Sequence, residues 1–459
     1  MSHARVIAGR RLHPPVRPEA FRTFAVLIVA AGAGAFVAMV PSIGFQLAVV
    51  IGAAISLLAL VMASRGTVLD PAFVLAGGLY LIGPVGTVIR QAGLGLSTLA
   101  LLAAIGAVFV TAALVTFPSA IRRLYVLAPL AALVALGFAS VAWSTHPEYG
   151  LDKLAVWILA GVLPAAFIVI LASARGGVQW GVVLAAALAV AAALLLFGGS
   201  SPEYPGRISL FGDNPIWMAR AMFVGALVAL FGNFPRIVKL MAVPILVAAG
   251  LVTVSLGPLL GLLAGAWAGW IASLLQHRGR DARQTGWVTM GLLSGVVLLV
   301  VLTDAVVGGE RSILATMVLS DPNVIGRAVL LDTAVGLFLG APVQGIGLGG
   351  FASLGFLEYP HNLVIEVAAE LGMVGLVLLG LWAALAFRGA LGSPLLVALL
   401  VATCVFALFS GSLASNAEFW MVSALAASGF ATAGRNPDQV PHGHRATTSL
   451  AVSRAGTVH

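Results

Sequence analysis

Four arginines of this chain lie in or beside two long stretches, residues 199–215 and 307–361, that interrupt a sequence made largely of apolar runs. A guanidinium group keeps its charge at physiological pH, and its planar fork donates paired hydrogen bonds to phosphate oxygens. Several such groups on one face predict a site for an anionic headgroup, above all a diphosphate. The four residues are Arg207, Arg220, Arg311 and Arg327.

Arg220 falls about one turn inside an apolar run, after Asn214 and Pro215. A charge inside a membrane segment costs several kcal/mol unless it is paired or hydrated, so it is a functional candidate by default. Two other interpretations stay open. The side chain could extend to the lipid headgroups, or it could form a structural pair with Asp213.

His361 is the second candidate for chemistry, because it stands at the start of an apolar run, and an imidazole can act as a base near neutral pH. It could instead cap a helix or lie at the membrane interface. Asn362, Glu366 and Glu370 follow at a spacing of four residues, which places them on one helix face. The two carboxylates could pair with the arginines, act as a base, or serve a purely structural ion pair.

Glycines recur between Gly345 and Gly350, without the Lys-Ser/Thr pair of a nucleotide-binding loop. This run predicts a tight turn in which backbone segments approach closely. The acidic residues on the same side are too scattered to predict a metal site.

The elements that must position these residues are membrane helices. Only 9% of the 459 residues are charged and 61% are hydrophobic, whereas a soluble domain carries about 25% charged residues. Apolar runs of the ~20 residues needed to cross a bilayer recur throughout. The sequence therefore predicts an all-α, polytopic transmembrane bundle of 12–14 spans. Candidate spans lie near residues 24–40, 43–63, 71–89, 97–117, 124–143, 154–173, 180–198, 216–234, 240–255, 258–275, 286–306, 362–384, 394–411 and 417–433.

The basic residues predict the orientation. If both termini are cytoplasmic, all but six of the 24 Lys and Arg fall on the cytoplasmic side, as the positive-inside rule requires. The net charge of +8 is then a topological signal and not a sign of nucleic-acid binding. Besides the four arginines above, the exceptions are Arg90 and Lys153, interpreted as interface anchors.

Three regions divide the chain. Residues 1–23 are a cytoplasmic tail, residues 24–433 form the transmembrane domain, and residues 434–459 are a polar tail expected to be disordered. The arginine-rich start resembles the n-region of a signal peptide, but the many apolar runs that follow favour an uncleaved first span. The long external stretch 307–361 is fairly apolar, and we expect it to fold partly into short helices.

Several segments together resemble the core motifs of the O-antigen ligase and polymerase superfamily. The later block combines a Pro and a Gly-x-Gly-x-Gly turn with His-Asn and a Glu-Leu-Gly-x-x-Gly helix. An earlier Asn-Pro loop and a closing Asn…Phe-Trp segment are also similar. In this chain they are GAP at 340–342, GIGLG at 345–349, HN at 361–362, ELGMVGL at 370–376, FGDNP at 211–215 with Arg207 before it, and NAEFW at 416–420.

The resemblance implies a glycosyltransferase of the bacterial cytoplasmic membrane. Such an enzyme passes a glycan from an undecaprenyl or other polyprenyl diphosphate to a hydroxyl of a glycan, lipid or protein acceptor on the outer face. It inverts the anomeric carbon and needs no metal or other cofactor. The family often has Ser-Arg-Gly where this chain has Ser255-Leu256-Gly257, so one arginine is missing.

In that reaction His361 is the expected catalytic base. Arg207, Arg220 and Arg327 are expected to bind the donor diphosphate. Supporting roles fall to Asn214, Asn362, Glu366, Glu370 and Arg311.

Two alternatives remain. Within the superfamily, a ligase and a polymerase differ only in the acceptor. Outside it, a transporter or lipid flippase would also have many spans and intramembrane charge, although its site usually lies at the membrane midplane.

Overall fold

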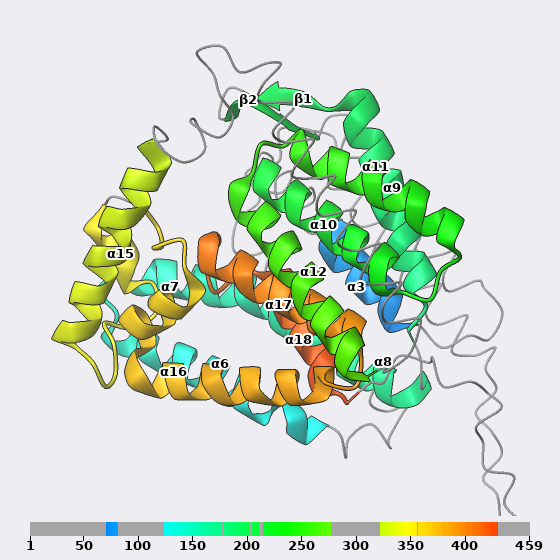
Figure 1. Ribbon diagram of the computed structural model, residues 1–459. Coiled ribbons are helices and arrows are strands. Elements are labelled where there is room, and N and C mark those ends of the chain that lie inside the picture. The colour runs from blue at the N-terminus through cyan, green and yellow to red at the C-terminus, as the bar shows by residue number, and fades with distance from the viewer. Residues whose placement is uncertain are drawn as a thin grey trace, which may run out of the picture.

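The protein is an all-α helical bundle (Figure 1). The computed structural model describes residues 70–80, 124–175, 178–201, 204–210, 214–276, 322–355 and 357–429. The predicted spans at 24–40, 43–63, 97–117 and 286–306, both terminal tails and Arg311 lie outside these residues.

The α-helices are α3 (Pro71–Tyr80), α6 (Ala128–Ser140), α7 (Pro147–Trp157), α8 (Leu163–Arg175), α9 (Trp180–Phe197), α10 (Pro215–Phe231), α11 (Arg236–Leu251), α12 (Leu256–Gln276), α15 (Pro322–Gly340), α16 (Leu363–Ala390), α17 (Pro394–Phe409) and α18 (Ala417–Ala427).

Five helical segments of the described chain are long and apolar enough to cross a membrane, which confirms the membrane class. They are Leu124–Trp143, Pro147–Ala172, Trp180–Phe197, Leu256–Gln276 and Leu363–Ala390. Each overlaps a span predicted from the sequence. The predicted span at 240–255 instead ends earlier, because α11 closes at Leu251 and a turn precedes α12.

Helix α10 forms the centre of one half of the molecule. Nearly all of its residues are buried, against α9, α11, α12 and α17. Small residues allow this close packing: Gly225 of α10 meets Ala187, and Gly265 of α12 packs against the backbone of Ala398. Membrane helices associate through such van der Waals packing, since lipid supplies no hydrophobic driving force.

A second half is built by α6, α7 and α16, with α17 and α18 lying between the two halves (Figure 1). Helix α8 packs against α18 and α3. A π-helical turn, Ile158–Val162, joins α7 to α8. Beside it the rings of Trp157 and Trp420 pack at a tilt of 48°, with their centroids 5.4 Å apart. The indole of Trp382 donates to Ser423 Oγ over 2.9 Å, which fixes α16 against α18.

The glycine run forms the tight turn that the sequence predicted, and this turn packs against a break in α16. At Gly372 (φ 65°) the helix loses its regular dihedrals, which frees two carbonyls of the preceding turn. Ile346 N–H donates to Ala369 O and Gly347 N–H donates to Glu370 O, both over 2.9 Å. Gly345 and Gly347 have positive φ and leave no room for a Cβ atom. Gly345 lies against the backbone of Glu370 in α16, and Gly347 lies against the backbone of Ser144.

The remaining elements form the rim of the molecule. In the stretch 307–361, α15 and the 3₁₀ turn η4 (Gly350–Leu354) confirm the predicted partly helical character for the described residues. In the stretch 199–215, a short antiparallel hairpin forms that the sequence had not indicated. Its strands are β1 (Gly199–Ser201) and β2 (Tyr204–Ser209), with Gly199 opposite Ser209.

Candidate functional site: an arginine-lined cavity

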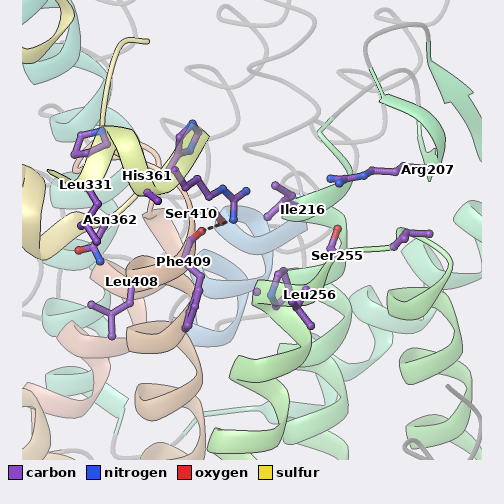
Figure 2. Close-up of a pocket in the computed structure, with 16 residues that line it drawn as sticks. Arg207, Ile216, Ser255, Leu256, Leu331, His361, Asn362, Leu408, Phe409 and Ser410 are labelled. Atoms are coloured by element: carbon purple, nitrogen blue, oxygen red, sulfur yellow. Dashed lines mark hydrogen bonds between the residues drawn. The ribbon is translucent and has the colours of Figure 1, made fainter. Parts of the chain in front are cut away.

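A cavity of about 570 Å³ lies where the hairpin, α12, α15, α16 and α17 meet (Figure 2). Its wall combines segments that are far apart in the sequence. The described residues that line it include two arginines and a histidine but no carboxylate. The lining residues are Arg207, Ile216, Val254–Pro258, Arg327, Ala328, Leu331, Pro360, His361, Asn362, Leu408, Phe409 and Ser410.

Arg207 reaches the cavity from β2. Its neighbour Ile208 donates its backbone N–H to Val252 O over 3.4 Å, which ties the hairpin to the turn before α12. In Figure 2 the side chain of Arg207 extends from one edge toward the side where His361 lies. The residue is half-buried, and it lines the cavity.

Arg327 reaches the cavity from the opposite wall, one turn into α15. Its Nη1 donates to Phe409 O over 3.1 Å, the contact drawn as a dashed line in Figure 2. Phe409 is the last residue of α17, and carbonyls at a helix end have no partner within the helix. The arginine therefore satisfies a helix terminus and places a positive charge beside the cavity.

His361 lies between α15 and the start of α16, and its backbone is strained. Its φ of 56° is in the left-handed region, which few residues other than glycine adopt. Asn362 then caps α16, because its Oδ1 accepts from Ile365 N–H over 3.1 Å. The ring packs edge-to-face on Tyr359, with centroids 4.6 Å apart. The sequence thus holds the imidazole at a fixed place on the cavity wall.

The imidazole is held in its neutral form. Burial, followed by the positive charges of Arg327 and Arg220, lowers the pKa of His361 to about 4. Its buried Nδ1 has no hydrogen-bond partner among the described residues. At neutral pH the imidazole is therefore uncharged, and it can accept a proton without first losing one.

Arg220 does not line the cavity, contrary to the predicted role as a direct ligand of a diphosphate. Only 2% of the residue is exposed, in the interior behind Ser410. It forms a buried ion pair with Glu418. Asp213, the partner considered from the sequence, lies outside the described residues. An arginine this deep in apolar helices needs such a partner, because an unpaired buried charge is costly.

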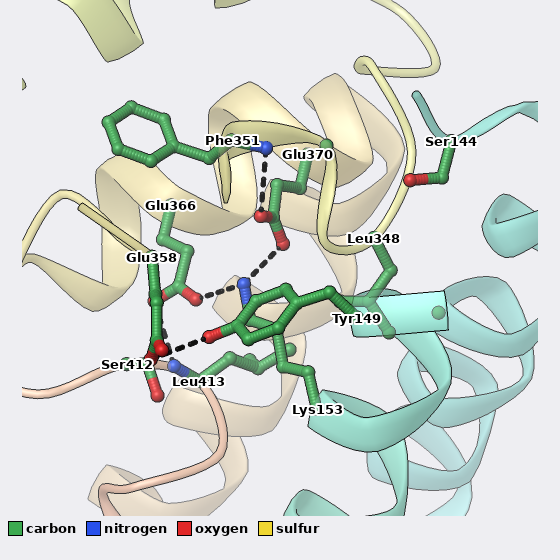
Figure 3. Close-up of polar contacts among 12 residues, drawn as sticks. Ser144, Tyr149, Lys153, Leu348, Phe351, Glu358, Glu366, Glu370, Ser412 and Leu413 are labelled. Atoms are coloured by element: carbon green, nitrogen blue, oxygen red, sulfur yellow. Dashed lines mark hydrogen bonds and ion pairs between the residues drawn. The ribbon is translucent and has the colours of Figure 1, made fainter. Parts of the chain in front are cut away.

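Glu366 and Glu370 also lie outside the cavity, where they share Lys153 (Figure 3). Lys153 Nζ lies 2.5 Å from Glu366 Oε1 and 2.6 Å from Glu370 Oε2, with all three side chains 1% exposed. The assignment of Lys153 as an interface anchor is therefore wrong. Of the interpretations offered for the two carboxylates, the geometry shows the structural ion pair, and neither carboxylate pairs with a described arginine.

One further predicted support, Asn214, acts locally. Asn214 is the N-cap of α10, and its Oδ1 accepts from Ile216 N–H over 3.0 Å. The segment that lacks the expected arginine, Ser255 to Pro258, does line the cavity. The first turn of α12 thus brings the positive end of a helix dipole to this wall.

The sequence indicated residues 416–420 as a motif but predicted no role for the connection between α17 and α18, residues 410–416. Ser410 and the carbonyl of Phe409 reach the cavity wall, and Glu418 stands just beyond the connection. The available signal was Glu418 itself, a carboxylate at the start of an apolar run that must face protein or water.

No protein-family model and no curated protein matches this chain.

Proposed function

We propose that the protein transfers a glycan from a polyprenyl diphosphate to an acceptor hydroxyl, at the outer face of a bacterial cytoplasmic membrane. One observation carries the proposal: Arg207, Arg327 and His361 line one cavity although they come from three separate segments. Two fixed cations beside a neutral base form an arrangement suited to an anionic leaving group and a nucleophilic alcohol.

The diphosphate suits the electrostatics of the cavity. The two guanidinium groups supply positive charge, and no described lining residue carries a carboxylate to oppose it. Paired donors from arginine match phosphate oxygens, and the N-terminal turn of α12 adds a favourable dipole. A volume of about 570 Å³ falls within the ~300–1,000 Å³ of small-molecule sites.

The lipid tail suits the apolar sides. Leu331 of α15 and Leu408 and Phe409 of α17 line the cavity, and each is about two-fifths exposed. In a membrane protein, exposed apolar side chains of this kind face hydrocarbon. A donor bound there would keep its isoprenoid chain in the bilayer and its headgroup among the arginines.

The reaction then needs one proton acceptor. The acceptor oxygen attacks the anomeric carbon from the face opposite the diphosphate and forms the new glycosidic bond. The bond from that carbon to the diphosphate oxygen breaks, and the lipid diphosphate leaves with the electron pair, stabilised by the arginines. His361 takes the hydroxyl proton. No acid is needed for a leaving group that is already a stable anion.

The low pKa of His361 is compatible with this role. Its depression arises in part from the charges of Arg327 and Arg220. A bound diphosphate offsets those charges, and a nearby anion favours the protonated imidazole. The base therefore becomes stronger when the donor is present, which couples donor binding to proton transfer.

The direct test is to incubate the purified protein with undecaprenyl diphosphate carrying a short glycan and with candidate acceptors. We expect release of undecaprenyl diphosphate and a glycosylated acceptor, and the acceptor that reacts separates a ligase from a polymerase. If neither product forms while the protein binds the donor, the transferase proposal is wrong.

A transporter or lipid flippase is the second candidate. The buried triad of Lys153, Glu366 and Glu370 favours it, because ionisable groups inside membrane helices often mark ion or proton pathways. Reconstitution in vesicles separates the two candidates. Movement of the glycolipid across the bilayer without a covalent product supports the transporter.

A further inference from the structure

We infer that Arg220 is a positioning residue of the cavity, which holds the α17–α18 connection in place and through it the guanidinium of Arg327. The inference deepens the proposed function and rests on it for its activity measurement. The role differs from that of a donor ligand, because the geometry gives Arg220 no contact with the space where a donor would bind.

The guanidinium of Arg220 holds both ends of the connection. At the α17 end, Nη2 donates to Phe406 O over 3.0 Å and to the carbonyl and hydroxyl oxygens of Ser410, each over 2.6 Å. At the α18 end, Nη1 donates to Asn416 Oδ1 over 2.9 Å and pairs with Glu418. One planar group thus fixes the point where α17 stops and the point where α18 begins.

The connection itself is closed by short-range bonds. Asn416 Nδ2 donates to Ser412 O over 2.8 Å, and Ser412 N–H donates to Ser415 Oγ over 2.6 Å. Residues 410–416 therefore form a compact unit that moves as a whole. Its position is set from outside, chiefly by Arg220 on one side and by Glu366, which accepts from Leu413 N–H over 2.8 Å, on the other.

This unit adjoins the acceptor of Arg327. Phe409 O accepts from Arg327 Nη1, and the next residue along the chain, Ser410, is the one that Arg220 holds by two atoms. A shift of the peptide between residues 409 and 410 moves the anchor of Arg327. A displacement of ~1 Å in a reacting site costs ~10²-fold in rate, so the connection is a sensitive point.

Lysine cannot replace Arg220 here. Its single ammonium has three donors at one point and cannot reach both ends of the connection in the way that a planar fork does. Arg220→Lys therefore keeps the charge, and with it the balance against Glu418, but loosens the connection.

The experiment compares Arg220→Lys, Glu418→Gln, Arg327→Lys and the double variant Arg220→Lys/Arg327→Lys, with Arg236→Lys as the matched control at an exposed arginine. We expect Arg220→Lys and Glu418→Gln each to raise the donor KM and lower turnover by ~10-fold or more. A loss of folded protein alone would lower apparent turnover and leave the KM unchanged. The double variant should be hardly worse than Arg327→Lys, because the two residues act through one contact.

The opposite pattern overturns the inference. If Arg220 binds the diphosphate directly, Glu418→Gln keeps full activity and the effects of the two arginine substitutions multiply. Should Arg220→Lys or Glu418→Gln fail to fold, Ser410→Ala removes a single hydroxyl acceptor, and an unchanged donor KM in that variant would also count against the inference.

Hydrogen exchange separates this inference from the proposed function. In Arg220→Lys the amides of residues 410–416 should exchange faster than in the wild type, whether or not the protein transfers glycans. If the wild type shows no transfer but exchange in this segment rises, the function is wrong and the positioning role stands. Unchanged exchange in this segment means that Arg220 does not hold the connection.

Discussion

Two clusters of charged residues lie within a few turns of each other, and they are arranged in opposite ways. The cavity gathers Arg207, Arg327 and His361 on an accessible wall that has no described carboxylate. The triad places Lys153 between Glu366 and Glu370 with 1% of each side chain exposed. The first cluster faces an open cavity, whereas in the second the carboxylates of the chain enclose the cation.

The triad serves as a scaffold for the cavity. Glu370 Oε1 accepts from Phe351 N–H over 3.4 Å, and Glu366 Oε2 accepts from Leu413 N–H over 2.8 Å (Figure 3). These contacts tie α16 to the turn after α15 and to the α17–α18 connection. The α17–α18 connection begins at Ser410, which lines the cavity, so the internal ion pairs support part of the wall that carries the accessible charges.

The largest effect is expected from a substitution that breaks the triad of Lys153, Glu366 and Glu370. Lys153→Met leaves two buried carboxylates without a cation, and removing one member of a buried ion pair costs ~3–5 kcal/mol of stability. Thermal unfolding in detergent should show a large loss. Glu370→Gln is the matched variant, because it leaves Lys153 paired with Glu366 and the pair has no net charge. This variant should lose far less stability. Equal stability of Lys153→Met and the wild type would mean that the triad is no scaffold.

The next effect is on chemistry in the cavity. His361→Asn removes the base but keeps a residue that tolerates the left-handed backbone, unlike His361→Ala. General base catalysis contributes ~10²–10⁴-fold, so transfer should fall by about that factor while the Kd for the lipid diphosphate stays near that of the wild type. Turnover close to the wild type in His361→Asn, or in the simpler His361→Ala, would remove the histidine from the mechanism.

Arg327→Lys tests the donor side of the cavity. A lysine keeps the charge but loses the paired contact with phosphate oxygens, and hydrogen bonds to charged groups contribute ~1.5–3 kcal/mol. Activity should fall by ~10–150-fold, measured as kcat/KM for the donor, with unfolding temperature nearly unchanged. The control is Arg388→Lys, at an exposed arginine near the end of α16. A normal kcat/KM in Arg327→Lys would make this arginine merely a cap for α17.

The sequence predicted the helices better than the pairs between them. Spans such as 124–143 and 394–411 were placed well, because length and hydropathy are local properties. Arg207, Arg327 and His361 were chosen from residue type and predicted side, and they do share a cavity. The partners of Arg220 and Lys153 could not be predicted, because they lie 198 and 217 residues away and depend on how the helices pack.

The smallest expected effect is the pH dependence of stability that His361 contributes. In the folded protein the pKa of His361 is about 4, whereas an unfolded histidine titrates near ~6.5. Between these values the unfolded state binds more protons, so this residue makes the protein less stable as the pH falls from ~6.5 toward 4 and contributes nothing above that range. Lowering the pH should therefore lower the unfolding temperature of the wild type more than that of His361→Asn. If the wild type is the more stable protein at neutral pH, the two temperatures converge; if the variant is the more stable, they move apart. The difference between the two proteins must in either case shift toward Asn on acidification. A difference that is constant from pH 7.5 to 5 would mean that neither burial nor the charges of the arginines lower this pKa, and that the cavity lacks the positive potential that distinguishes it from the triad.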